Sequence, residues 1–443
     1  MNPGALLAAA MLALPAWADA QAPRYTPDFL GPVQPGPVNA SAEVIGRVTV
    51  AGNLRGAVMR AGQPYQLLPL PTGMISAVAN DINDLGVVVG QVGPYYSPEF
   101  IGRAAAWYPN GDGGYSVVVF GVLPGHVISS ADAVNNFGDI VGYSGNGTYR
   151  YPVYFDTIGD LVDLPSSGIF DPVDINDQRI VVDNSSTAKR LDLDTMIAED
   201  LGVPDPPGGT NYRATQTAAI NELNQVVGSA ILTTSTSCDR QATRYTDGVG
   251  WQMFSSCGAN NGANDINDLG DMVMLITITP YVRFEGGGSF ALESLVVNDV
   301  GHWYAVTTSA GWINNNRQIV MYGTNPTTGQ TGTLLLTPEA TTSVPPGGDL
   351  ASRLALTVEP NPFHAVTSIR FSLASPGPVD LAIYDPAGRR VAAVLAGAWR
   401  DHGVSEATWD GRDFRGLPVP GGVYFACLRA GALMTHRRLV VLK

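Results

Sequence analysis

Cysteine, histidine and charged residues are scarce in this chain of 443 residues. It has three cysteines and five histidines, and charged residues make up 14% of the total. Three cysteines do not fit a disulfide scaffold or a zinc site, and the histidines form no pair at metal-ligand spacing. The chain has no Lys/Arg cluster of the kind that binds a membrane surface, and it has no apolar run long enough to span a bilayer. We therefore expect no cofactor, no metal centre and no transmembrane span.

Positive charge is also in deficit. Asp and Glu number 39 against 25 for Lys and Arg, which gives a formal net charge of −14. An acidic surface repels phosphate backbones, so we expect no nucleic-acid partner. Glycine (51) and proline (32) are abundant, as in chains with many turns between short strands. A hydrophobic content of 45% argues against a disordered chain.

The first twenty residues have the pattern of a secretion signal. An apolar stretch covers residues 6–17, and Ala18-Asp19-Ala20 forms a small-x-small cleavage site. The pattern departs from the usual one because no Lys or Arg precedes the apolar stretch. We predict that residues 1–20 are a signal peptide and that the mature chain is secreted or lies at the outer surface of a bacterial cell.

A short phrase, Ile-Asn-Asp-x-Gly followed by a β-branched strand, returns along the chain. Its clearest copy runs from Ile82 through Gly86 to Gly90. The repeated asparagines are Asn83, Asn135, Asn176, Asn221, Asn267 and Asn314. Successive asparagines are 41 to 52 residues apart, a period typical of β-propellers.

Three to four strands per repeat match the size of one propeller blade. Residues 43–46 belong to an incomplete first unit, and residues 318–336 begin an incomplete last unit, so that the two together would close the ring. The sequence predicts an all-β protein with a β-propeller-like domain of six or seven blades, seven being favoured. We assign residues 21–40 to an extended leader, 41–337 to the repeats and 338–353 to a linker rich in Pro, Thr and Gly.

The repeated phrase resembles the signature Ile-Asn-Asp-x-Gly-x-Val-Val-Gly of the HAF family of extracellular repeats. Residues 82–90 match it fully, and residues 266–273 match it apart from its last glycine. The resemblance covers the repeat domain and implies an exported repeat protein, without implying a particular activity.

The Asn-Asp-x-Gly group has two interpretations. Asp81, Asn83 and Asp84 offer oxygen atoms close together, as a calcium site needs. However, Gly86 is followed by Val-Val-Val-Gly-Gln, with no distal acid to complete a calcium loop. We favour tight turns in which the Asn and Asp side chains bind backbone N–H groups and Gly takes a positive φ.

Known catalytic motifs are absent from the sequence. It has no His-Glu-x-x-His, no Gly-x-Ser-x-Gly and no phosphate-binding glycine loop. Acidic pairs such as Glu199-Asp200 could serve a glycosidase, but one sequence does not place two such acids together. We predict no catalytic residues and a protein that is not an enzyme.

Aromatic residues near corresponding strand ends are the candidates for ligand binding. The favoured interpretation is that these rings fill the wedge between twisted blades. The alternative is a platform that binds a sugar or a peptide on one face of the ring. The platform would consist of Trp107, Tyr154, Tyr245, Trp251 and Trp303, with Trp312 at an equivalent position.

Two of the three cysteines lie in one repeat. Because an exported chain meets an oxidising environment, Cys238 and Cys257 are a candidate disulfide. Cys427 is left over and alternates with Val423 and Phe425, so we expect a buried thiol on the core face of a strand.

From residue 354 the pattern changes to hydrophobic alternation. Ile369, Phe371 and Leu373 share one face of a strand, and residues 379–383 repeat this pattern. Turn signals follow each strand, and roughly seven short strands in this segment predict an Ig-like β-sandwich over residues 354–443.

Several short motifs stand in order along this C-terminal segment. Their residues are Asn361, Pro362, Tyr384, Asp385, Gly388, Arg389, Trp409, Asp410, Gly411, Gly422, Val423, Tyr424 and Lys443. The segment resembles the Ig-like domain of flagellar hook-capping proteins and the C-terminal sorting domain of type IX secretion substrates. The resemblance implies either a sorting signal, whose partner is the export machinery, or an accessory β-sandwich. The basic pair Arg437-Arg438 and the final lysine favour sorting.

These features predict an exported, non-catalytic binding protein of the cell surface or the extracellular space. The C-terminal domain would direct secretion or surface attachment, and the ligand would be an extracellular glycan or protein. A structural component of a surface layer or matrix and an extracellular polysaccharide-active enzyme are the two alternatives.

Overall fold

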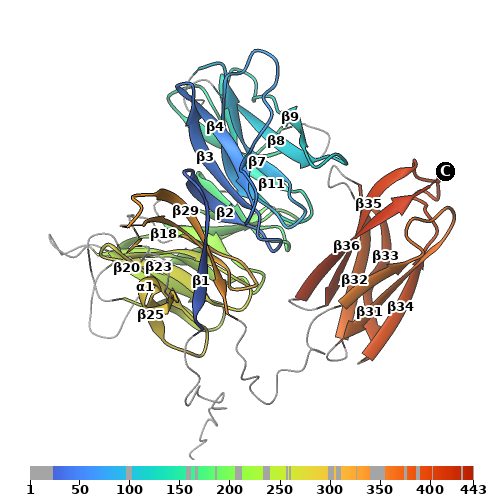
Figure 1. Ribbon diagram of the computed structural model, residues 1–443. Helices are drawn as coiled ribbons and strands as arrows, with labels where there is room; N and C mark the ends of the chain where they lie inside the picture. The colour runs from blue at the N-terminus through green and yellow to red at the C-terminus, as the bar shows by residue number, and fades with distance from the viewer. Residues whose placement is uncertain are drawn as a thin grey trace, which may run out of the picture.

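The computed structural model is built almost wholly of β-strands, arranged as a ring of blades and a separate sandwich (Figure 1). The structure describes residues 23–95, 102–155, 161–164, 168–184, 187–204, 212–232, 240–255, 258, 261–297, 304–305, 311–325, 327–339, 355–373, 377–385, 390–401, 403–430 and 433–442. Within these residues, no helix is long and apolar enough to cross a membrane. The expected signal peptide and most of the expected linker lie outside them.

Seven antiparallel sheets of the described chain form the blades of a propeller. The innermost strand of each blade ends just before a repeated asparagine. These strands are β2 (Gln34–Val38), β6 (Ser76–Ile82), β10 (Ile128–Val134), β14 (Pro172–Ile175), β18 (Tyr212–Ile220), β22 (Gly262–Ile266) and β27 (Trp312–Ile313). Each lies beside the innermost strand of the next blade, and β2 lies beside both β6 and β27, so the ring is closed. The prediction of a propeller-like domain is confirmed, with seven blades.

The remaining strands of each blade follow in antiparallel order toward the rim. The second strands are β3 (Val44–Val50), β7 (Val88–Gly93), β11 (Ile140–Gly145), β15 (Ile180–Asp183), β19 (Val226–Leu232), β23 (Met272–Ile276) and β28 (Ile319–Thr324). The third strands are β4 (Asn53–Met59), β8 (Arg103–Pro109), β12 (Arg150–Phe155), β16 (Ala188–Asp192), β20 (Arg240–Thr246), β24 (Thr279–Arg283) and β29 (Thr331–Pro338). The outermost strands are β5 (Gln66–Leu67), β9 (Tyr115–Val119), β13 (Leu161–Asp163), β17 (Ile197–Gly202), β21 (Gly250–Met253), β25 (Ser289–Ala291) and β1 (Tyr25–Gly31). A short strand β26 (Tyr304–Ala305) also pairs with β28, and α1 (Leu292–Leu295) follows β25.

Both ends of the repeat domain contribute to one blade. Strand β1 pairs antiparallel with β29, from Tyr25 opposite Pro338 onward, so the start of the chain completes the last blade and closes the ring. The expectation that residues 43–46 and 318–336 share one blade is wrong, because β3 belongs to a complete blade of its own, β2 to β5. Strands β1 and β2 fall in the segment expected to be an extended leader, so the propeller begins earlier than residue 41. The sequence did not indicate these two strands because both contain proline, which is uncommon within strands. Proline is tolerated there because both strands lie at a sheet edge, where a missing N–H breaks no ladder.

The hydrophobic core lies between successive blades. The valines of the repeated phrase pack across this gap: Val88 of β7 and Trp107 of β8 lie against Ile45 and Val58 of the preceding blade. All four side chains are fully buried. Burial of each aliphatic chain contributes roughly 1.5–3 kcal/mol, so the repeated valine run explains how one sheet adheres to the next.

Each repeated asparagine binds the next blade. Its Nδ2 donates to the backbone carbonyl of the corresponding asparagine, at 2.9–3.1 Å. These residues form what we call the asparagine ring: Asn39, Asn83, Asn135, Asn176, Asn221, Asn267 and Asn314. All seven are buried, and Asn314 donates to Asn39 to complete the circle. Asn39 was not among the six repeats recognised in the sequence, because Ala40 and Ser41 replace the usual acid and its neighbour.

The same asparagine also shapes its own turn. Asn83 Oδ1 accepts hydrogen bonds from the backbone N–H groups of Leu85 (3.1 Å) and Val87 (2.9 Å). The residue three places after the asparagine has a positive φ, which is 78° at Gly86. The turn interpretation of the Asn-Asp-x-Gly phrase is therefore confirmed, and the glycine is explained by its left-handed backbone.

The last glycine of the phrase has a different cause. A Cβ on Gly90 would lie 2.0 Å from the carbonyl oxygen of Val78 on the neighbouring strand. Gly142 and Gly228 meet the same obstacle in their own blades. In each case the opposing strand contains a β-bulge that brings its backbone close.

The C-terminal segment forms a sandwich of two antiparallel sheets. The three-stranded sheet has the order β30 (Ala355–Glu359), β31 (Thr367–Leu373) and β34 (Gly403–Trp409). The four-stranded sheet has the order β33 (Arg390–Arg400), β32 (Gly377–Tyr384), β35 (Gly422–Ala430) and β36 (Leu433–Val441). The predicted inward faces are confirmed, since Ile369, Phe371, Leu373, Val379, Leu381 and Ile383 belong to one buried core.

Motif residues of this segment hold the sandwich together. Trp409 is buried between Phe363 and Tyr424, with ring centroids 5.6 Å apart on both sides, and its Nε1 donates to the Arg412 carbonyl at 2.9 Å. Asn361 links the segment that precedes β31 with strand β36, because its Oδ1 accepts a hydrogen bond from the Val440 N–H at 2.8 Å. These contacts give the motif a structural role.

We predict that Asn83→Ala lowers the free energy of unfolding by about 3 kcal/mol, because three hydrogen bonds are lost, two of them buried, and their partners are left unpaired. Urea denaturation of the full chain measures this change. Asn110→Ala is the matched control: Asn110 Oδ1 makes the same two turn bonds, to Asp112 and Gly114, in an exposed hairpin outside the ring. We expect it to cost less than about 1 kcal/mol. Equal losses would contradict a special role for the ring.

Candidate functional site

A second circle of hydrogen bonds follows the asparagine ring at one mouth of the central channel. The backbone N–H of the residue after each ring asparagine donates to a side-chain oxygen in the next blade, at 2.7–2.9 Å. The side chains that accept are Asp84, Asn136, Asp177, Glu222, Asp268 and Asn315. The circle is open only at Ala40, which has no polar side chain. Four carboxylates therefore converge on a channel cavity of about 170 Å³.

Burial strongly affects these acids. It raises the pKa values of Asp177 and Glu222. The nearby Asp177 raises the pKa of Glu222 further, and Asp84 and Asp268 raise that of Asp177. Deeper in the channel wall, burial raises the pKa of Asp81 to about 6, of Asp174 to about 8 and of Asp265 to about 7. Each of these three carboxylates joins two blades, as Asp81 does through the Val134 N–H at 2.8 Å. The channel is therefore held by acids that are partly protonated near neutral pH.

The outer face of the four-stranded sheet of the sandwich lies over this mouth of the channel. The Tyr384 ring of β32 packs on Phe137 beside the asparagine ring, with centroids 5.2 Å apart. Arg429 of β35 is close enough to lower the pKa of Glu222. Burial lowers the pKa of His436 on β36, and the nearby Asp84 opposes this shift. Basic groups of the sandwich thus face acidic groups of the propeller.

A cleft of about 520 Å³, which we call the interdomain cleft, opens between the two domains. From the propeller it is lined by Phe137, Asp139, Tyr154, Asp177, Arg179 and Asp194, and from the sandwich by Asp380, Tyr384, Arg390, Cys427 and Arg429, among others. It thus combines aromatic rings with charges of both signs, the mixture expected of a site for a polar ligand.

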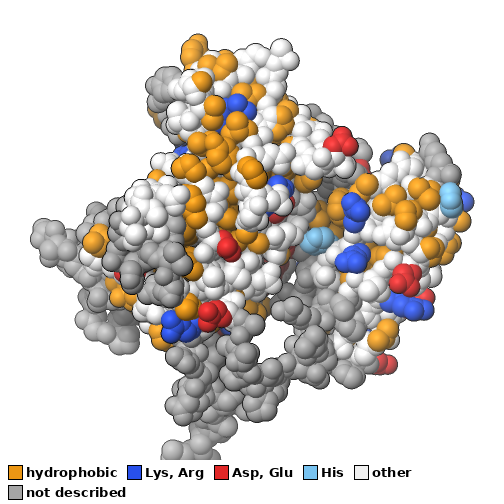
Figure 2. Space-filling model, in the orientation of Figure 1, with side chains coloured by type: hydrophobic (Ala, Val, Ile, Leu, Met, Phe, Trp, Pro, Cys, Tyr) orange, Lys and Arg blue, Asp and Glu red, His pale blue; other side chains and the backbone are white. Residues whose placement is uncertain are grey.

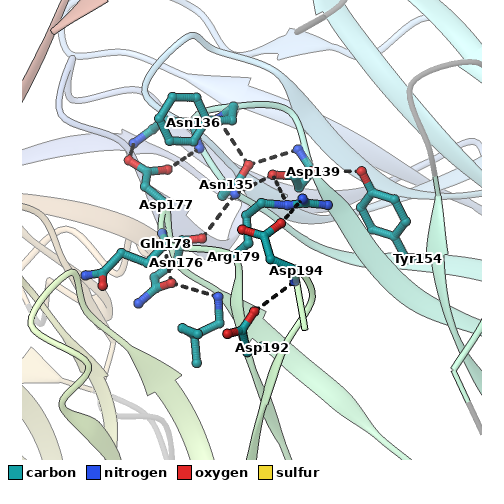
Figure 3. Close-up of polar contacts among 12 residues, drawn as sticks. Asn135, Asn136, Asp139, Tyr154, Asn176, Asp177, Gln178, Arg179, Asp192 and Asp194 are labelled. Carbon is teal, nitrogen blue, oxygen red and sulfur yellow. Dashed lines mark hydrogen bonds and ion pairs between the residues drawn. The ribbon is translucent and has the colours of Figure 1, made fainter. Parts of the chain in front are cut away.

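The polar groups on the propeller side are joined to one another (Figure 3). Tyr154 donates its hydroxyl to Asp139 Oδ1 at 2.8 Å, and Asn135 donates to the other oxygen of this buried acid at 2.9 Å. Arg179 lies between Asp139 and Asp194 and forms ion pairs with both, the first at 3.3 Å. Burial, reinforced by Asp139, raises the pKa of Tyr154. These side chains are held in fixed positions toward the cleft.

Arg179 occupies a position that favours glycine. It is the residue three places after Asn176, where its φ is +63°, while Gly86 and Gly138 fill the same position in other blades. A left-handed backbone costs an L-residue about 1–2 kcal/mol. Arg317 repeats the arrangement, with φ +60° and an ion pair at 2.7 Å to Asp271 of the preceding blade. At both arginines, an ion pair with an acid of the preceding blade offsets the cost of the left-handed backbone.

The aromatic platform, the alternative interpretation, does not assemble as one surface, and most of the candidate rings pack in or against cores as the favoured interpretation expects. Trp107 is fully buried between blades, and its Nε1 donates to the Pro69 carbonyl at 2.8 Å. Tyr245 and Trp251 pack edge to face with centroids 5.4 Å apart, against the core of their own pair of blades. Tyr154 alone of the described candidates lines the interdomain cleft. Trp303 lies outside the described residues, and Trp312 packs against a core cluster.

The expectation for Cys427 needs a correction. The thiol is buried, and burial raises its pKa to about 12. However, it does not face the core of the sandwich, which takes Tyr424, Ala426 and Leu428 of the same strand. Cys427 faces the propeller with Val423 and Phe425, because the docked propeller covers this second face of the sheet. Alternation shows which residues share a face, but both faces of this strand are buried.

Several other predicted residues lie outside the described part of the chain. They are Cys238, Cys257, Gly388, Arg389 and Lys443. Among the described residues, no group of three or more His, Cys, Asp or Glu side chains has an arrangement that could hold a metal ion. The charged residues of the cleft were missed because they occupy ordinary turn positions of different repeats. Arg179 in place of the turn glycine was the one available signal.

No family model matches the chain, and no curated protein matches it. Among solved structures, the chain is similar to a fungal alcohol oxidase of the AA5 family in complex with copper, at 10% identity over 96% of this chain and 100% of that chain, with a TM-score of 0.46. It is also similar to an extracellular domain described as part of a hybrid two-component system of B. thetaiotaomicron, at 10% identity over 95% of this chain and 57% of that chain, with a TM-score of 0.41. Likenesses this distant carry no argument about activity.

We predict that the protein loses stability as pH rises from 5 to 8. Asp81, Asp174 and Asp265 have folded-state pKa values above those of the unfolded chain, so the folded state binds more protons in this window. The lowered pKa of His436 acts in the opposite direction, but it is one group against several. Thermal unfolding should show a midpoint lower by roughly 5 °C at pH 8 than at pH 5.

The matched control is the triple variant Asp81→Asn, Asp174→Asn and Asp265→Asn, which removes the titrating groups. Its unfolding midpoint should vary less with pH than that of the natural chain. A midpoint that rises from pH 5 to 8 in the natural chain would contradict the assignment.

Proposed function

We propose that this protein is an exported, non-catalytic binding protein that holds an extracellular glycan or protein segment in the interdomain cleft. The observation that carries the proposal is the convergence of Tyr154 and Arg179 from the propeller with Tyr384 and Arg390 from the sandwich on one cleft. Clefts between domains are common places for ligands. Export is supported by the signal-like pattern of residues 1–20.

The pairing within the cleft favours binding over catalysis. A general acid or nucleophile needs a reactive atom within reach of the substrate. Asp139 instead is buried and accepts from Tyr154 and Asn135, while its ion pair with Arg179 neutralises its charge. Such a network keeps donors and aromatic edges in place, as recognition requires. The proposed role is therefore to bind a polar ligand without changing it.

The C-terminal sandwich is proposed to direct secretion or surface attachment. The order of its motifs, which resembles that of type IX sorting domains and hook-capping Ig-like domains, supports this role. Its contacts with the channel mouth, above all Tyr384 on Phe137, also make it part of the cleft. Binding in the cleft thus requires the sandwich to remain attached to the propeller.

We expect Arg179→Gly to weaken binding by about tenfold or more, since a charged hydrogen-bonding group of the cleft is lost. The turn should tolerate the change because glycine fills this position in other blades. Binding of the full chain is measured on an array of polysaccharide fragments and on immobilised peptides. Arg317→Gly is the control, because it removes an equivalent strained arginine and its ion pair far from the cleft lining. Similar losses in both variants would contradict a site in the cleft.

We expect the mature protein to retain the sandwich, because this domain supplies one side of the cleft. Intact-mass measurement and terminal peptide sequencing, on protein from the medium and from the cell envelope, test this. A mature chain that ends within residues 338–353 would remove the sandwich side of the cleft and overturn the proposed site. Self-assembly without any ligand would favour a structural role, and turnover of a polysaccharide would favour an enzyme.

A further inference from the structure

Five inner strands contain a β-bulge at the residue three places before the ring asparagine. The bulged residues are Asn80, Asp132, Val173, Ala218 and Asn264. A bulge turns the side chain of its extra residue away from the regular alternation, and bulges are frequent beside functional sites. The residue type at this position varies between blades, so the fold itself does not require a polar side chain there.

Three adjacent bulges line a pocket of about 350 Å³, which we call the funnel pocket. Asn80, Asp132 and Val173 lie along the channel wall, roughly 10 Å from the asparagine ring at about 3.3 Å per residue. Arg47, Gln91, Arg150 and Asp171 complete its polar lining. No residue of the sandwich lines this pocket, so it is independent of the interdomain cleft.

Asp132 is the best-defined group of the funnel pocket. Its Oδ1 accepts hydrogen bonds from Ser130 Oγ at 2.6 Å and from Asn80 Nδ2 at 3.2 Å. Asn80 Nδ2 is itself fixed by the Ala131 carbonyl at 2.9 Å. Within the described chain, Asp132 Oδ2 has no hydrogen-bond partner of its own. The carboxylate is thus oriented by the protein with one oxygen left for a ligand.

Holding an acid at this place destabilises the fold. Burial raises the pKa of Asp132 to about 6, and the nearby Asp171 adds to the effect. Ala218 occupies the same bulge without this penalty. A costly local choice that the repeat itself does not require is typical of functional positions.

The lining also indicates the class of ligand. Two arginines and two aspartates balance in charge, so the pocket favours neither a cation nor an anion. Carboxylate, amide and guanidinium groups lie side by side, and together they can accept from and donate to adjacent hydroxyl groups. Arg150 is held in place by stacking over the Tyr143 ring at 4.3 Å. We infer that the funnel pocket binds a neutral, hydroxyl-rich molecule of the size of a mono- or disaccharide.

The test is calorimetric titration of the full chain with neutral mono- and disaccharides, and in parallel with uronic acids, amino sugars and free amino acids. We expect saturable binding of at least one neutral sugar, weakened by about tenfold or more in Asp132→Asn and in Asn80→Ala. Asn264→Ala is the matched control, since it alters the same bulge in a blade outside the pocket. It should bind as the natural chain does.

Thermal unfolding separates binding from folding. Asp132→Asn should unfold at the same temperature as the natural chain or higher, because a buried carboxylate is removed. No binding of any neutral sugar, or equal binding in Asp132→Asn, would overturn the inference. Tighter binding of a uronic acid, amino sugar or amino acid would also overturn it, because the ligand would then be charged. Loss of binding in Arg179→Gly but not in Asp132→Asn would place the sugar in the interdomain cleft.

Discussion

The hydrogen bond from each ring asparagine to the carbonyl of the next is the interaction on which the propeller depends. It is buried and repeated in every blade, and it closes through Asn39 and Asn314. The same side chain also fixes its own turn, so a single residue type sets both the local backbone and the distance between blades. An unpaired amide or carbonyl here would be costly because these residues are buried. The blades are held together by this ring and by the apolar layers between them. Charged side chains are sparse on the face of the propeller that Figure 2 shows.

A frame held by one repeated residue leaves neighbouring positions free to vary. The place after the asparagine carries acids in four blades and becomes a circle of interblade contacts. The turn glycine is replaced by Arg179 and Arg317 where an acid of the preceding blade can pair with them. The two polar bulge residues that line a pocket, Asn80 and Asp132, lie in adjacent blades on one side of the channel. Both proposed binding sites thus lie where blades depart from the repeat, as expected when function is added to a repetitive scaffold.

The sandwich is bound to this frame through a sheet whose second face is partly covered by the propeller. One face forms its own core, and the other meets the acidic mouth of the channel with Tyr384, Arg429 and His436. In Figure 1 the sandwich stands beside the propeller as a separate body, joined to it in sequence by the segment after β29. Each domain has a hydrophobic core of its own. They also create the interdomain cleft, which neither domain has by itself.

The sequence alone determined the repeat, the turn role of its Asn-Asp-x-Gly phrase and the inward faces of the sandwich strands, because each depends on local backbone chemistry or alternation. It did not reveal strands β1 and β2, whose prolines are acceptable only at sheet edges. Nor did it show the outward direction of Cys427, since periodicity records which residues share a face and not what covers it. The meeting of Tyr154 with Arg179, and of Asn80 with Asp132, was decided by the tertiary structure alone. Ring closure brings residues into contact across 41 to 275 positions of sequence, and no local pattern encodes such distances.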